Sequence, residues 1–124
     1  MKKKIEKNEK IFIAGSNGMV GSSIKRSLLK KPFCQSNKFL NLLTPSRIEL
    51  DLLDSESVTN WFTKEKPNIV ILAAAKVGGI HANYKYPSEF LLENIKIQTN
   101  IIEAALREGV RRLLFLGSSC IYPK

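Results

Sequence analysis

Short apolar runs alternate with longer amphipathic segments along most of the chain. Runs at residues 11–14, 39–43, 69–75 and 113–116 have the length and composition of strands buried in a parallel sheet. Between these runs, apolar positions recur at helical spacing and polar residues occupy the remaining positions. The pattern therefore predicts the order β-α-β-α-β-α-β.

Turn and capping residues delimit the three predicted helices. The first helix must end before Pro32, because proline cannot continue it, and Asp54 can cap the second. The third is expected to begin at Ser88, after a loop at residues 76–87, and to end with Gly109 at its C′ position. Its expected buried stripe consists of the apolar residues Leu91, Leu92, Ile95, Ile102, Ala105 and Leu106.

Strands that alternate with helices pair in parallel through right-handed crossovers. The sequence therefore predicts an α/β protein with a doubly wound parallel sheet of the Rossmann type. This sheet would be incomplete, with the first four strands and three helices. A length of 124 residues fits one domain, and no internal repeat or linker is visible.

Composition and charge exclude several classes of protein. A hydrophobic content of 44% permits a buried core, and no apolar run reaches the ~20 residues of a membrane span. The net charge of +9 could indicate nucleic-acid binding, but many of the lysines crowd into residues 1–10 without interleaved aromatic residues. We therefore expect a cytoplasmic protein with a solvated basic tail, no nucleic-acid site and no membrane partner. Cys34 and Cys120 lack metal-ligand spacing, so no metal site is expected.

Three glycines link the first predicted strand to the first predicted helix. Gly15 would permit a tight turn, Gly18 a close approach of phosphate to the backbone, and Gly21 close packing of helix on strand. The helix N-terminus would direct N–H groups at an anion. The spacing is G-x-x-G-x-x-G rather than G-x-G-x-x-G, and a turn without a ligand is the alternative. The position after a buried strand favours a dinucleotide pyrophosphate.

Further candidates follow the second and third predicted strands, where ligands collect in such sheets. Arg47 would accommodate the 2′-phosphate of NADP, unless it is an ordinary loop arginine. Asp51 and Leu52 could place a carboxylate and an apolar side chain against adenine. Small residues after the third strand would let a cofactor approach the backbone, or would pack against a helix: Ala73, Ala74 and Ala75.

Residues with chemical potential follow the fourth predicted strand. A hydroxyl at Ser118 can donate a hydrogen bond to a carbonyl oxygen, and a thiol at Cys120 can exchange a proton with a carbon acid. The alternative for Cys120 is a small buried hydrophobic role. His81, the only histidine, is expected to be a solvated loop residue.

Three segments together resemble a known family. Residues 12–21, 72–80 and 114–124 are similar to the GDP-L-fucose synthases, which are extended short-chain dehydrogenases/reductases. Residues 94–105 also resemble the helix that lines the active site in that superfamily. The resemblance implies NADP(H) as cofactor and GDP-4-keto-6-deoxy-D-mannose as substrate. It implies epimerisation of the carbons beside the ketone, followed by reduction of the ketone with hydride from NADPH.

The resemblance also assigns roles to individual residues. Ser118 corresponds to the serine that binds the keto oxygen, and Cys120 to the acid/base of epimerisation. Asn17 stands where family members can have a basic residue, so NADP preference is expected to rest on Arg47. The cofactor-binding positions of the family correspond to Gly15, Asn17, Gly18, Met19, Val20, Gly21, Arg47, Asp51 and Leu52.

The Tyr-x-x-x-Lys pair of this family does not occur before Lys124. The resemblance therefore implies an N-terminal fragment, inactive by itself, in which residues 11–124 form the first part of an NAD(P)-binding Rossmann domain after the tail at residues 1–10. The full-length enzyme would be a homodimer. The alternatives are another NAD(P)-dependent sugar-nucleotide epimerase or dehydratase, and a non-catalytic nucleotide-binding or nucleic-acid-binding module.

Overall fold

The chain forms a single parallel sheet. The structure, a computed structural model, describes residues 5–6, 8–31 and 41–118. Its strands are β1 (Ile11–Ala14), β2 (Leu42–Leu43), β3 (Ile69–Leu72) and β4 (Arg112–Phe115). Every pair is parallel, and the strand order is β2-β1-β3-β4. The predicted parallel sheet is therefore confirmed.

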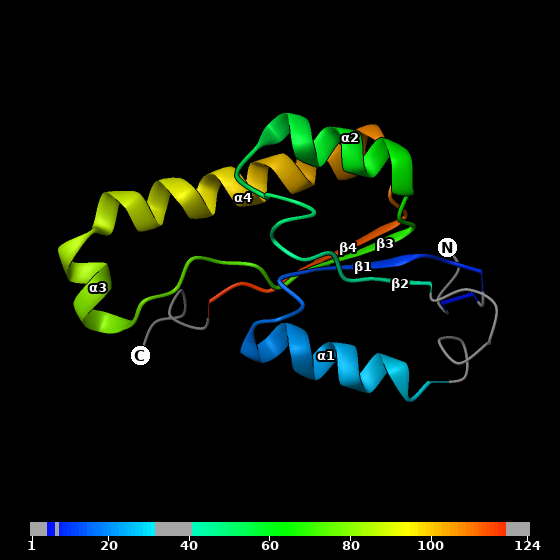
Figure 1. Cartoon of the computed structure of the whole chain (residues 1–124), viewed down its shortest axis with the longest axis horizontal. Helices are drawn as coiled ribbons and strands as arrows, with labels where there is room; N and C mark the ends of the chain where they lie inside the picture. Colours follow the sequence, from blue (N-terminus) through cyan, green and yellow to red (C-terminus); the bar gives the residue numbers. More distant parts are fainter. Residues whose placement is uncertain (1–4, 7, 32–40, 119–124) are drawn as a thin grey trace.

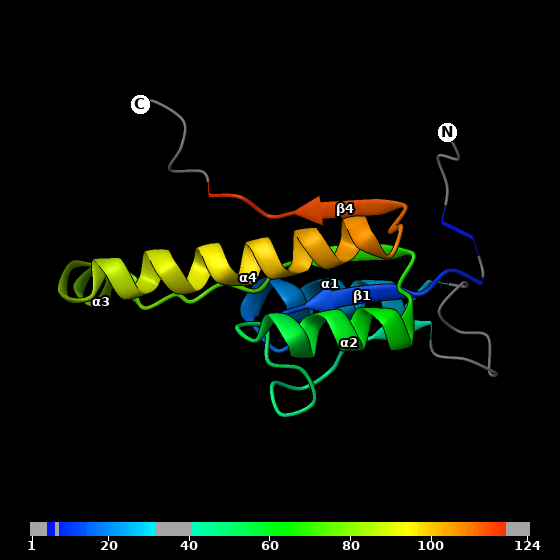
Figure 2. The same cartoon turned by 90° about the horizontal axis from the view of Figure 1, so that it is seen from above.

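Helices cover both faces of this sheet. They are α1 (Met19–Leu29), α2 (Ser55–Glu65), α3 (Gly79–Lys85) and α4 (Pro87–Arg107). Figure 1 shows α1 on one face and α2 with α4 on the opposite face. From above, α2 and α4 lie side by side and β4 follows the outer edge (Figure 2). This is the doubly wound, Rossmann-type arrangement that the sequence predicts, with one short helix more than expected.

Alternate residues of β1 point to opposite faces and enter two separate cores. Phe12 packs beneath α2 and α4, where its ring meets the Phe62 ring edge-on at a centroid distance of 5.6 Å. Ile11 and Ile13 pack on the other face, beside Ile24 of α1. Burial of successive apolar residues on both faces is the reason that this strand lacks polar alternation.

The predicted ends of two helices are confirmed. The Asp54 carboxylate accepts a hydrogen bond of 3.0 Å from the Glu56 N–H, and α2 begins at Ser55. Gly109 follows α4 with φ of 68°, a left-handed conformation that glycine adopts without a steric penalty.

The region between β3 and α4 differs from the prediction. Residues 76–87 are not one long loop, because α3 occupies most of them. Ser88 as a helix cap is wrong: Tyr86 is the N-cap and Pro87 is the first residue of α4. Proline suits that position since its missing N–H would have no partner there. Gly78 also lacks a side chain that would collide with Phe90 of α4, so the chain folds back on this helix.

The predicted buried stripe of α4 is largely wrong. Ala105 is buried as expected, but Leu91, Leu92, Ile95, Ile102 and Leu106 are exposed. The helix buries a different set, namely Ile97, Ile101, Ala104 and Ala105. The helix is apolar on two sides and only one of them faces the sheet. Its N-terminal half also extends past the carboxyl ends of the strands (Figure 1).

Strand boundaries shift modestly from the predicted ones. The second predicted strand reduces to β2, with residues 39–40 outside the described ranges. The third ends at Leu72, so Ala73, Ala74 and Ala75 follow β3 instead of belonging to it. β4 is an edge of the described sheet, and its side chains at residues 113–115 are exposed.

Part of the predicted basic tail contacts the residue that precedes β4, at the amino-terminal end of the sheet. The Arg111 guanidinium donates hydrogen bonds of 2.5 Å to both carboxylate oxygens of Glu9, a residue that is 9% exposed. Burial by itself would raise the pKa of the Glu9 carboxyl, but the Glu6 N–H and Arg111 outweigh it and lower that pKa below its usual value. In the described ranges, no helix has the length and apolar character needed to cross a membrane.

Candidate functional site

A cavity of about 450 Å³ opens where β1 and β3 end. Four parts of the chain line it: the glycine loop after β1, the segment after β2, the segment after β3, and α4. Among the residues predicted from sequence, the lining includes Gly15, Asn17, Gly18, Arg47, Asp51, Leu52, Ala73, Ala74 and Ala75. The fold therefore brings segments from three strand ends to one concave site.

The glycine loop packs directly on neighbouring backbone. Gly15 has φ of 82°, and a side-chain Cβ there would lie 2.7 Å from both Cα and N of Ala74. A Cβ at Gly21 would overlap the carbonyl oxygen of Gly15. The turn and the first turn of α1 can approach each other this closely only with glycine at these two positions.

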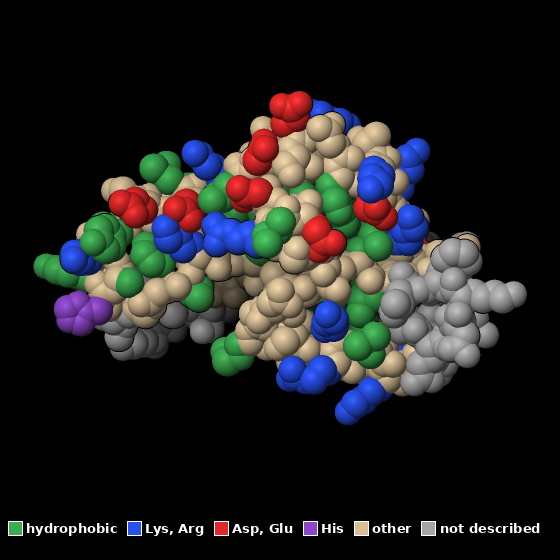
Figure 3. Space-filling view, in the orientation of Figure 1, with side chains coloured by type: hydrophobic (Ala, Val, Ile, Leu, Met, Phe, Trp, Pro, Cys, Tyr) green, Lys and Arg blue, Asp and Glu red, His purple; other side chains and the backbone are tan. Residues whose placement is uncertain are grey.

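The start of α1 suits an anion. Gly18 is the N-cap and supplies no side-chain acceptor, while the first N–H groups of any helix lack intrahelical partners. Met19, Val20 and Gly21 form this first turn rather than the cavity wall, and α1 contains no acidic residue. Figure 3 shows Lys and Arg side chains on the lower face over α1, whereas acidic side chains gather over α2 and α4. The dipole of α1 and the basic side chains on this helix therefore both favour a negatively charged ligand.

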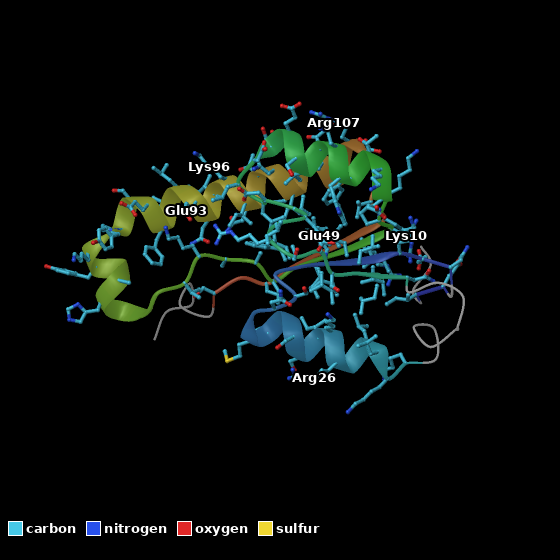
Figure 4. All side chains as sticks on the ribbon, viewed as in Figure 1. Lys10, Arg26, Glu49, Glu93, Lys96 and Arg107 are labelled. Carbon is cyan, nitrogen blue, oxygen red and sulfur yellow. The ribbon has the colours of Figure 1, made fainter. Side chains whose placement is uncertain are left out.

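A compact turn presents Arg47 to the cavity. The Glu49 carboxylate accepts the Ser46 N–H at 2.7 Å, and the Ser46 hydroxyl accepts the Glu49 N–H at 3.3 Å. Hydrogen bonding of the Glu49 carboxyl, first to the Ser46 backbone N–H and then to the Ser46 side chain, lowers its pKa. Arg47 lies exposed within this turn, and Glu49 is labelled in Figure 4 on the segment between β2 and α2. The Ser-x-x-Glu pattern of a capping box could have revealed the turn from sequence.

The third wall follows β3 and touches α4. The Ala73 N–H donates to the Ala14 carbonyl at 3.0 Å, which extends the sheet contacts for one residue beyond β3. Lys76 then forms an ion pair of 2.6 Å with Glu93, a residue of α4 labelled in Figure 4. Sequence reasoning did not assign Lys76, Glu93 or Ile97 to the site, although all three line the cavity.

The structure describes only one of the two predicted catalytic residues. Ser118 lies exposed beyond β4 and does not line the cavity, and Cys120 lies outside the described residues. His81 is exposed but belongs to α3 and not to a loop. Within residues 5–6, 8–31 and 41–118, no group of three His, Cys, Asp or Glu side chains could hold a metal ion.

Comparison with known proteins gives a consistent family. The model of the NAD dependent epimerase/dehydratase family matches residues 11–124. GDP-L-fucose synthase 1 of Arabidopsis thaliana is 54% identical over 119 residues, covering 96% of this chain and 35% of that protein. GDP-L-fucose synthase of Escherichia coli (strain K12) is 50% identical over 116 residues, covering 94% of this chain and 34% of that protein.

A solved structure gives the same result for the fold. MlghC, a GDP-mannoheptose C4 reductase from Campylobacter jejuni with NADP bound, has a TM-score of 0.85 and 37% sequence identity. The match covers 97% of this chain and 34% of that one. The chain thus spans about a third of the length of the curated relatives that it matches.

Proposed function

The chain belongs to the NAD dependent epimerase/dehydratase family, and from this premise we propose that its cavity binds NADP(H). The observation that carries the proposal is that the glycine loop, Arg47 and the wall after β3 line the same cavity. The residues fit such a group, because Gly15 and Gly18 line the cavity without side chains and the N-terminus of α1 begins directly beside them. The NADP bound to MlghC supports the choice of cofactor.

Each part of the dinucleotide has a proposed partner. The pyrophosphate would accept hydrogen bonds from the backbone N–H of Asn17 and from the first turn of α1, which contains Met19 and Val20. Gly18 would let the phosphate come close, because it has no side chain, while its own N–H donates to the Gly15 carbonyl at 3.1 Å. Arg47 would pair with the 2′-phosphate, since its guanidinium offers donors in a planar fork. The adenine would lie at Asp51 and Leu52, and Ala73, Ala74 and Ala75 would let the remaining part approach the backbone.

We further propose that the protein converts GDP-4-keto-6-deoxy-D-mannose to GDP-L-fucose, as 50% and 54% identity to curated GDP-L-fucose synthases supports. NADPH supplies the hydride for reduction when it is bound. The Cys120 thiol would move protons at the carbons beside the ketone, which the carbonyl group acidifies. The Ser118 hydroxyl would donate a hydrogen bond to the keto oxygen and so stabilise the negative charge that develops there.

The proposal extends to partner subunits and location. We propose that the full-length protein is a cytoplasmic homodimer, with isomerase as well as oxidoreductase activity. The exposed apolar side chains of α4, including Leu91, Ile95 and Leu106, support self-association. Sedimentation equilibrium of the full-length protein tests the dimer, and a monomer at all accessible concentrations would exclude it.

Cofactor binding can be tested on the chain as it is. Isothermal titration calorimetry with NADPH should give a saturable, one-site isotherm. A DNA duplex, titrated at two salt concentrations, should show no binding that persists at the higher salt concentration. Salt-sensitive DNA binding without affinity for NADPH would instead support a basic nucleic-acid-binding module.

Activity requires a second experiment. Residues 11–124 would replace the matching segment of the Escherichia coli relative, and NADPH oxidation would be followed with GDP-4-keto-6-deoxy-D-mannose. Cys120→Ser should block epimerisation yet retain NADPH binding, and Ser118→Ala should slow the reduction. Thr99→Ala, at an exposed position of α4, is the control. Full activity in both site variants would refute the assigned roles.

A further inference from the structure

One helix holds two walls of the cavity by their backbones. The Asn94 side chain of α4 accepts the Lys76 N–H at 2.7 Å, and its amide donates to the Lys76 carbonyl at 3.1 Å. Lys76 directly follows Ala73–Ala75, where β3 has already ended. The asparagine amide therefore satisfies both backbone groups of a residue that has no strand neighbour, as a paired strand would do.

A second asparagine holds the opposite wall. The Asn100 amide donates a hydrogen bond of 2.9 Å to the carbonyl of Leu52. Leu52 belongs to the segment after β2, which also contributes Arg47 and Asp51 to the cavity. Six residues along a helix correspond to a rise of about 9 Å. The two anchor points are thus fixed relative to each other by the rigid backbone of α4.

Side chains of the same helix complete the arrangement. Ile97 lies between the two asparagines in the chain, is buried, and lines the cavity. Glu93 forms the 2.6 Å ion pair with Lys76, whose ammonium group also lies 5.3 Å from the centre of the Phe90 ring. These contacts reinforce the wall after β3, so this wall cannot shift without breaking several interactions with α4.

From this geometry we propose that Asn94 and Asn100 are positioning residues that fix the two walls of the cavity for the two halves of the dinucleotide. Asn100 positions the wall that takes the adenosine half, and Asn94 positions the wall that takes the nicotinamide half. The inference rests on the proposed binding of NADP(H). Neither asparagine is among the residues that line the cavity, so both act through the backbones they hold.

Ligands of different length separate the two roles. NADPH spans both walls, whereas adenosine 2′,5′-bisphosphate contains only the adenosine half. The variants are Asn94→Leu and Asn100→Leu, which keep a similar side-chain volume without hydrogen-bonding atoms. Thr99→Ala on the same helix is the matched control, because Thr99 is exposed and holds neither wall. Dissociation constants would be measured by isothermal titration calorimetry, and folding by circular dichroism.

The expected result is a split between the two variants. Loss of a hydrogen bond that positions a wall should weaken binding about tenfold, or ~1.4 kcal/mol. Asn100→Leu should weaken the binding of both ligands by this factor. Asn94→Leu should weaken NADPH binding by the same factor. It should change the affinity for the bisphosphate by less than about twofold, since the wall that Asn94 holds does not touch that ligand. Thr99→Ala should change neither affinity.

The inference is overturned if both variants weaken both ligands equally, or if neither variant changes either affinity. If the unmodified chain binds neither ligand, the proposed function itself fails, which is a different outcome. Where a leucine variant does not fold, Asn94→Asp and Asn100→Asp replace the pair. Aspartate at 94 keeps the acceptor for the Lys76 N–H, whereas aspartate at 100 lacks the N–H that donates to the Leu52 carbonyl. Binding of the bisphosphate should then weaken only in Asn100→Asp. An equal loss of bisphosphate affinity in Asn94→Asp would again overturn the inference.

Discussion

Substitution of Gly15 by alanine tests how the cavity is built, because the added methyl group has two costs there: a strained backbone conformation and a collision with neighbouring backbone. Its backbone is left-handed, with φ of 82°, and an added Cβ would lie 2.7 Å from Cα and N of Ala74. Gly109 has nearly the same conformation, with φ of 68°, but a Cβ there would meet nothing within 4 Å. Gly15→Ala and Gly109→Ala therefore share the conformational cost and differ in the collision.

The magnitudes follow from these distances. A residue with a side chain in the left-handed region costs ~1–2 kcal/mol, which applies to both variants. Ordinary contact begins at 3.4 Å, so the Ala74 backbone must retreat by several tenths of an ångström in Gly15→Ala. Overpacking against structure that cannot easily move costs a further ~1–3 kcal/mol. We expect a loss of ~2–5 kcal/mol for Gly15→Ala and ~1–2 kcal/mol for Gly109→Ala.

Urea unfolding measures the difference directly. Trp61 is the only tryptophan and packs against Phe12 at a centroid distance of 4.5 Å, so its fluorescence reports on the core. The proposed NADPH binding should also weaken more than about tenfold in Gly15→Ala, because Ala73 and Ala74 would be displaced from the cavity wall. Two variants whose stabilities agree within ~0.5 kcal/mol would refute the close contact, given that such differences are the usual error of additivity.

Two further substitutions test the charged groups. Arg47→Ala should lower NADPH affinity about tenfold and leave NADH affinity unchanged, because only the 2′-phosphate carries the extra charge; equal losses in calorimetry would exclude this contact. Glu9→Gln should lower the free energy of unfolding at pH 7 by ~1–2 kcal/mol, since it removes the charged partner of Arg111. The pKa of Glu9 is lowered in the folded protein, so the advantage of the unmodified chain should be full above a pH of ~4.3 and vanish as pH falls through the folded pKa. An advantage that persists at low pH in urea unfolding would contradict this account.

Local sequence features predicted the sheet and the first two helices, because each depends on residues close in the chain. β1 and β3 are continuous apolar runs, and Asp54 is a helix cap whose acceptor lies two residues from its donor. The buried face of α4 could not be predicted in this way. Both Ile95 and Ile101 recur at helical spacing with other apolar residues, and only the position of the sheet decides that Ile101 is buried.

The candidate site also has a part that the sequence predicts and a part that it does not. Parallel strands end at one edge, so residues that follow β1, β2 and β3 could be expected near one another, and Gly15, Arg47 and Ala74 do line one cavity. The anchors on α4 gave no comparable signal. Asn94 lies 18 residues from Lys76 and Asn100 lies 48 residues from Leu52, and an asparagine within a helix does not reveal which backbone it binds.

The need for such anchors follows from the architecture of the sheet. Much of the cavity wall lies beyond the ends of the strands, so the segments that form it have left the ladder that would pair their backbone groups. A side chain with both a donor and an acceptor can replace a strand neighbour, and Asn94 does so for Lys76. Since the ligand would rest on these backbones, substitutions of Asn94 and Asn100 should change its affinity although neither residue lines the cavity. Side chains that bind loop backbone therefore belong to the determinants of a site of this type, as much as the residues that line it.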